Sequence, residues 1–130
     1  MKRVSILLVA LFALSSCSKH CEIFPSEVKE KKLYLLAING QSIPKESQAY
    51  IILHDNSFEA FSGCNNFYGT FELDEEQIHF KIKDIDTNVC RYIPLQHVFL
   101  ESLVHSSRIV THNNIVSFKE KGRSLLLFKK

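Results

Sequence analysis

Apolar and polar residues alternate along much of the chain after residue 32, and this period-two pattern predicts strands with one buried face. Residues that favour tight turns separate the predicted strands, as at Asn39-Gly40 and Asn113-Asn114. We therefore predict eight strands, at Leu33–Ile38, Ala49–His54, Ser57–Ser62, Phe67–Leu73, Gln77–Ile82, Arg108–Thr111, Ile115–Phe118 and Ser124–Phe128.

One segment, Pro94 to Ser106, has helical spacing instead, and Pro94 suits the first turn of a helix. The predicted apolar stripe comprises Leu95, Val98, Phe99 and Leu103, widened by Leu100 and Val104, while Gln96, Glu101 and His105 face outward. The order is thus five strands, a helix and three strands. We expect an α+β domain, an antiparallel curved sheet or partial barrel of about eight strands closed by one helix near residues 94–106.

The first 17 residues have the pattern of an export signal. Lys2 and Arg3 precede an apolar run of about 11 residues, Val4 to Leu14, and then small residues. A helix that spans a bilayer needs roughly 20 apolar residues, so we predict that residues 1–16 are removed.

Leu14-Ser15-Ser16-Cys17 resembles the lipobox of bacterial lipoproteins, in which the cysteine is acylated and becomes the new N-terminus. The alternative is an ordinary signal peptide with a coincidental cysteine. The resemblance implies that Cys17 is lipidated and that the membrane is a partner through this anchor. The residue after the cysteine is Ser18, which resembles lipoproteins that are sorted to the outer membrane. We therefore expect a cell-envelope protein on the periplasmic or surface face of the outer membrane. We assign residues 17–32 to a tether, with a helical turn within 26–32 as the alternative for its last part.

Composition predicts one small folded domain without a nucleic-acid partner. The 130 residues are 45% hydrophobic and 23% charged. The chain has 16 basic and 14 acidic residues, and the loss of Lys2 and Arg3 makes these numbers equal. Nucleic-acid binding requires a net basic face to contact phosphates, so this charge balance argues against it.

The stretch from Gly63 to Gly69 is the most distinctive of the chain. Two of the chain's four glycines bracket a cysteine and two asparagines there. Such residues suit a constrained bend between two strands. With Asn39-Gly40 and the Thr87 to Cys90 segment, it resembles the META (HslJ-like) domain family, which we assign to residues 33–130. The family-motif positions are Asn39, Gly40, Gly63, Cys64, Asn65, Gly69, Thr87 and Cys90.

The sequence departs from the family pattern at three positions. Leu33 stands where the family usually has Trp. Thr87 precedes Cys90 by three residues instead of four, and Val89 replaces the usual Met between them. These departures weaken any role attached to the threonine motif.

The resemblance implies an exported protein of small β-rich fold without an established reaction. We therefore expect no catalytic residues and no cofactor, and a role in envelope integrity or stress tolerance. The alternative is a binding module or inhibitor for one envelope or extracellular protein partner.

The remaining cysteines are interpreted in an oxidising compartment, where disulfides form. We hypothesise a bond between Cys64 and Cys90, and the alternative is two small buried thiols. Cys21 lies in the expected tether. The six histidines show no close ligand spacing, so we expect no metal site.

Overall fold

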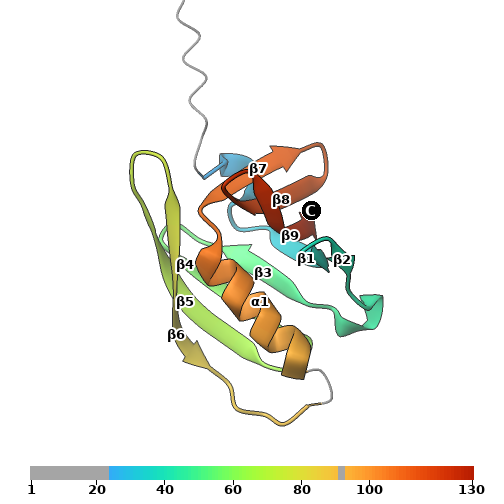
Figure 1. The fold of residues 1–130 in the computed structure, drawn as a ribbon. Helices are drawn as coiled ribbons and strands as arrows, with labels where there is room; N and C mark the ends of the chain where they lie inside the picture. The colour runs from blue at the N-terminus through green and yellow to red at the C-terminus, as the bar shows by residue number, and fades with distance from the viewer. Residues whose placement is uncertain (1–23, 91–92) are drawn as a thin grey trace, which may run out of the picture.

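The computed structural model describes residues 24–90 and 93–130, so Cys17, Ser18 and Cys21 lie outside the described residues. Figure 1 shows one curved antiparallel sheet and a single α-helix. The strands are β1 (Lys32–Ile38), β2 (Gln41–Ser42), β3 (Tyr50–Leu53), β4 (Ser57–Phe61), β5 (Asn66–Leu73), β6 (Ile78–Ile85), β7 (Arg108–His112), β8 (Ile115–Glu120) and β9 (Arg123–Lys129), and the helix is α1 (Ile93–His105). The predicted α+β class is confirmed.

The sheet order is β6-β5-β4-β3-β1-β9-β8-β7, with β2 paired to the end of β1. The two-residue strand β2 was not predicted, because the exposed Gln41 and Ser42 carry no alternating pattern. Asn39 and Gly40 connect β1 to β2 with φ of 50° and 79°, which matches the tight two-residue hairpin turn with both central residues left-handed.

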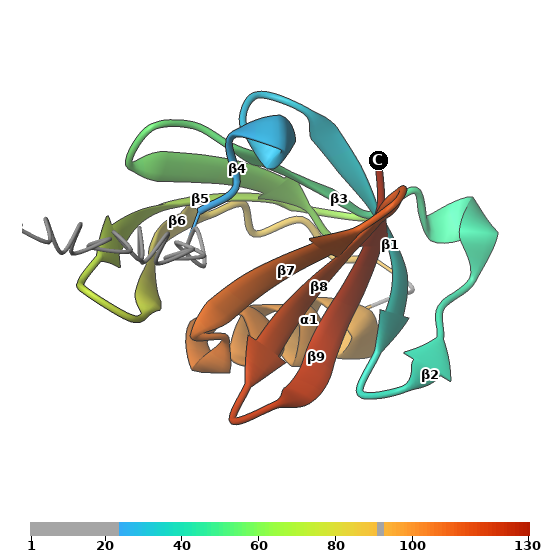
Figure 2. The same cartoon turned by 90° about the horizontal axis from the view of Figure 1, so that it is seen from above.

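The helix lies against one side of the curved sheet, where it contacts β6, β9 and β1 (Figures 1 and 2). The first residue of β6, Ile78, donates its amide hydrogen to the carbonyl of Ser107, which follows the helix, at 2.9 Å. This bond joins the two outer edges of the sheet at one point. Phe99 of α1 is fully buried, with its ring 5.2 Å from Phe67 and 6.1 Å from Phe128. Aromatic packing therefore holds the helix against strands from both halves of the sheet.

The buried face of α1 is narrower than predicted. Val98 and Val104 are 36% and 48% exposed, although both were assigned to the apolar stripe. Gln96, predicted to face outward, is half-buried and hydrogen-bonded to the β4–β5 connection. Phe99 and Leu103 place the helix, since both are fully buried, and the polar Ser102 is buried on the same helix.

Residues 24–31 pack on the domain, although the expected tether extended to residue 32. Val28 is fully buried, and the Phe24 ring lies 5.2 Å from Phe71. The helical turn expected within this segment is a short 3-10 helix, η1 (Ser26–Val28). This packing could not be predicted from the sequence, because two apolar residues among charged ones produce no periodic pattern.

The chain enters the domain at one end of the strands. The entry segment lies beside the β3–β4 turn, because Lys29 pairs with Leu53 at the end of β3. The β4–β5 connection, the β1–β2 turn and the start of α1 lie at the opposite end of these strands (Figure 1). In residues 24–90 and 93–130, no helix is long and apolar enough to cross a bilayer.

Candidate functional site

The β4–β5 connection, Ser62 to Asn65, forms a sharp corner that requires glycine. Gly63 has φ of 94°, which L side chains rarely adopt. A Cβ at this position would lie 2.8 Å from the backbone oxygen of Ser47. Ser47 belongs to a second 3-10 helix, η2 (Lys45–Ser47), so the corner packs directly against the segment between β2 and β3.

Asn65 connects this corner to the segment before the helix and to the helix itself. Its side-chain nitrogen donates to the Asn88 carbonyl at 3.0 Å and to Oε1 of Gln96 at 2.9 Å. Its side-chain oxygen accepts from the Asn88 amide at 2.9 Å. Asn65 is 3% exposed, so its polar atoms are satisfied within the protein.

Ser62 adds a local turn to the same network. Its hydroxyl oxygen accepts from the Asn65 amide at 3.1 Å and lies 3.0 Å from Oε1 of Gln96. Both donors to Gln96 come from the corner, so the first turn of α1 is held at a fixed position beside it.

A disulfide joins Cys64 to Cys90, with 5.8 Å between their Cα atoms and a sequence separation of 26. On the loop-entropy estimate, a bond that closes a loop of this size contributes about 3.5 kcal/mol. It fastens the corner to the same segment that Asn65 holds, so a covalent link and a polar network act in parallel.

Gly69 of β5, the last glycine of the motif, is required by close packing. A Cβ there would lie 2.6 Å from the Phe58 ring and would also meet the backbone oxygen of Lys81. The β5–β6 register shifts between Tyr68 and Gly69, and glycine allows the strands to approach at this irregularity.

Sequence reasoning identified part of this corner. It predicted Gly63, Cys64 and Asn65 as its centre, but not the bonding partners Asn88 and Gln96. A glutamine in the first turn of a helix has no special sequence pattern, so only the fold reveals its role. The motif residue Thr87 is exposed and takes no part in the network.

A groove runs along the flank of α1, at the end of the domain opposite the chain entry. Its apolar part has a volume of about 450 Å³. This part is lined by Ile38, Asn39, Gln41, Ser42, Ile43, Pro44, Pro94, Leu95 and Val98. The motif residue Asn39 therefore stands at the rim of a cavity.

A second part of the groove, about 350 Å³, continues along the helix and shares Asn39 and Val98 with the first. Its lining is mostly polar and charged, with Glu101, Ser102, His105, Glu120, Arg123 and Leu125. The exposed Val98 is thus part of a concave surface that is apolar at one end and charged at the other. Such a surface suits binding of an amphipathic group.

Among the residues that the structure describes, no three histidine, cysteine or acidic side chains converge on a metal-sized site. The acidic turn between β5 and β6 has a local role. Asp74 accepts hydrogen bonds from the Glu76 and Gln77 amides at 3.0 and 2.8 Å, and lies 2.9 Å from His79 Nε2. The Glu76 amide first, then His79 and the Gln77 amide, lower the pKa of the Asp74 carboxyl below its ordinary value.

The fold and the site define a small antiparallel β domain, closed by one helix, with a disulfide-tied Gly-Cys-Asn corner. The sequence model of the META domain family matches residues 26–130, and the chain belongs to this family. The start of the match at residue 26 agrees with the burial of Val28.

Solved structures share this fold at low sequence identity. A protein from Burkholderia xenovorans, solved by NMR, is 17% identical with a TM-score of 0.62, and the match covers 79% of this chain and 83% of that one. A DUF4847 family protein from Bacteroides vulgatus, solved by crystallography, is 10% identical with a TM-score of 0.60, over 78% of this chain and 93% of that one. No curated protein sequence is significantly similar to the chain.

Proposed function

We propose that the chain is a lipid-anchored protein of the bacterial envelope whose META domain acts without catalysis and contributes to envelope integrity or stress tolerance. The N-terminal pattern that ends at Cys17 supports the anchor. Two or more acyl chains on one residue attach a protein stably, whereas a single chain binds marginally.

The observation that carries the non-catalytic role is the internal use of the family motif. Cys64 is in a disulfide, and the Asn65 side chain makes its bonds to Asn88 and Gln96 inside the protein. Catalytic groups must reach a substrate, and these two residues are committed to holding the corner and the helix together. The motif is therefore best understood as architecture.

The direction of chain entry supports an orientation on the membrane. A lipid at Cys17 would lie near the entry end of the domain, close to the β3–β4 turn. The corner and the groove would then face away from the lipid surface, toward the aqueous side of the envelope.

The anchor is tested by expressing wild-type chain, Cys17→Ser and Cys21→Ser in the source bacterium with labelled palmitate. We expect label and membrane fractionation for the wild type and Cys21→Ser, and loss of both for Cys17→Ser. Label retained in Cys17→Ser would contradict the anchor.

The envelope role is tested with a deletion strain, complemented by the wild type or by Cys17→Ser. We expect the deletion to reduce survival under heat and detergent, and only the wild type to restore it. Unchanged survival of the deletion strain would contradict this role.

A binding module for one envelope protein partner is the second candidate, and the groove beside α1 favours it. Val98 lines both parts of the groove, whereas Val104, also exposed on α1, lines neither. We therefore expect a groove-binding partner to be captured by the wild type and by Val104→Glu, but not by Val98→Glu. Equal capture by all three chains would contradict binding in the groove.

A further inference from the structure

Residues 24–31, which we call the N-terminal strap, pack on the domain through the buried Val28 and the Phe24 ring, and their last residues meet the end of β3 through polar contacts. The Glu30 amide donates to the Leu53 carbonyl at 2.7 Å, and Lys29 makes an isolated bridge to Leu53. Glu30 has φ of 62°, a left-handed backbone conformation that residues other than glycine adopt uncommonly. The strap thus turns sharply at the point where it meets the end of β3.

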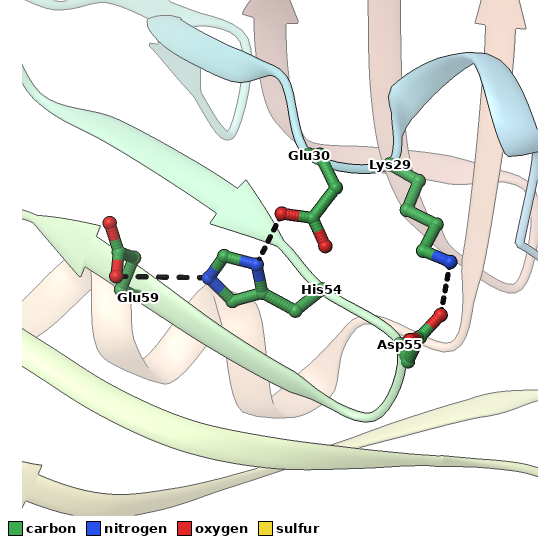
Figure 3. Close-up of polar contacts among 5 residues, drawn as sticks. All are labelled: Lys29, Glu30, His54, Asp55 and Glu59. Carbon is green, nitrogen blue, oxygen red and sulfur yellow. Dashed lines mark hydrogen bonds and ion pairs between the residues drawn. The ribbon is translucent and has the colours of Figure 1, made fainter.

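Charged side chains surround this point of attachment (Figure 3). His54, which follows β3, places Nδ1 2.7 Å from Glu30 of the strap and Nε2 3.7 Å from Glu59 of β4. Lys29 forms an ion pair with Asp55. The hydrogen bond to Asp55 and its negative charge raise the pKa of Lys29, so this pair persists at neutral pH.

Two carboxylates on opposite sides of one imidazole make the attachment depend on its protonation. A neutral imidazole has one N–H, whereas the imidazolium has two and can attract both carboxylates. The charged groups around His54 are Lys29 and Glu30 on the strap, Glu59 on β4 and Asp55 in the β3–β4 turn.

The strap has one further charged attachment, which does not involve a histidine. Glu27 accepts from the Thr111 hydroxyl and from Lys130 Nζ, the latter at 3.1 Å. These two bonds, with the hydroxyl first, hold the pKa of Glu27 below its ordinary value. Glu27 therefore stays negatively charged at neutral pH. Among the charged side chains of these contacts, His54 is the one histidine, and histidine is the residue type that can change charge near neutral pH.

We propose that the strap is a pH-sensitive latch, closed when His54 is protonated and loosened as the pH rises. Protonated His54 attracts Glu30 and Glu59 together, so the latch is strongest at acidic pH and weakens on deprotonation. Val28 is fully buried and the Phe24 ring packs on Phe71, so deprotonation of His54 loosens only the end of the strap that meets β3, residues 29–31. The latch does not depend on the proposed lipid anchor.

The latch is tested by hydrogen exchange of the full-length chain in detergent at about pH 5.5 and 8, corrected for intrinsic exchange rates. We expect protection of residues 29–31 to fall by about two- to fivefold at the higher pH, the scale of one exposed ion pair. His54→Gln should remove this pH dependence, and Glu59→Gln should reduce it. His79→Gln, which alters a distant histidine–carboxylate pair, should leave it unchanged.

Equal protection of the strap at both pH values in the wild type would overturn the latch, and so would pH dependence that persists in His54→Gln. A pH effect of the same size in the β4 and β5 peptides would also overturn it, because it would report global unfolding. Palmitate labelling of Cys17 is read out separately, so failure of the anchor and failure of the latch are distinguishable.

Discussion

Replacement of Asn65 by alanine tests whether the corner holds the domain together. The change removes two donated hydrogen bonds, to Asn88 and Gln96, and one accepted from the Asn88 amide. Each lost bond in a buried setting costs about 1 kcal/mol, and a partner left without water costs more. Asn88 is exposed and water can satisfy part of its loss, so we expect a total of about 2–4 kcal/mol.

Asn65→Asp tests the loss of the donated hydrogen bonds with almost no change in side-chain shape. The carboxylate still accepts from the Asn88 amide, but its second oxygen then faces two acceptors, the Asn88 carbonyl and Oε1 of Gln96. Gln96 can rotate its amide to donate, whereas a backbone carbonyl cannot. Aspartate should therefore be as damaging as alanine at neutral pH, despite its nearly identical shape.

The assay is urea denaturation followed by far-UV circular dichroism, because the chain has no tryptophan. The control is Asn66→Ala, which changes the adjacent asparagine, half-buried at the start of β5 and outside the side-chain network. We expect Asn66→Ala to change the unfolding free energy by less than about 0.5 kcal/mol. The reasoning is refuted if Asn65→Ala lies within that same range of the wild type while the disulfide is intact.

Three further predictions concern other parts of the fold. Gly69→Ala should reduce the unfolding free energy by about 3 kcal/mol or more, since its Cβ meets packed atoms, whereas Gly122→Ala, in open space with φ of 79°, should cost about 1 kcal/mol in the same urea titration. Equal losses would contradict the packing argument. Replacing Cys64 and Cys90 together by alanine should cost about 3.5 kcal/mol, and a stability unchanged from the oxidised wild type would count against the bond. The lowered pKa of Asp74 stabilises the folded state above the ordinary carboxyl range, and this contribution is lost as the pH falls through the lowered value. Asp74→Asn should therefore lower Tm at pH 7 and have a smaller effect at acidic pH, and an effect that stays constant as the pH falls would contradict it.

Most strands followed from the sequence because strands such as β3, β4 and β5 bury alternate residues. Phe58 and Ala60 are buried while Glu59 between them is not, as the period-two pattern requires. Where burial depends on a single contact, the pattern carries no information. Val28 is an isolated apolar residue among charges, and its burial depends on packing that only the fold supplies.

The helix shows why the candidate groove could not be predicted. Val98 and Phe99 are adjacent and both apolar, so helical spacing assigned them to one stripe. In the fold, Phe99 is fully buried, whereas Val98 lies at the edge of the helix and lines the groove. Adjacent residues of a helix point about 100° apart, and Asn39 of the β1–β2 turn lines the same groove as Val98. A groove between distant segments depends on their separation, which local periodicity does not encode.

The corner and the groove contact neighbouring residues in the first part of α1. Gln96 is held by Ser62 and Asn65, while Leu95 and Val98 line the groove. The corner thus fixes one wall of a cavity that it does not itself line. If the groove binds a partner, Asn65→Ala should weaken that binding without removing a contact to the partner, and Asn66→Ala should not. A motif that serves architecture would then determine function through the position of the helix.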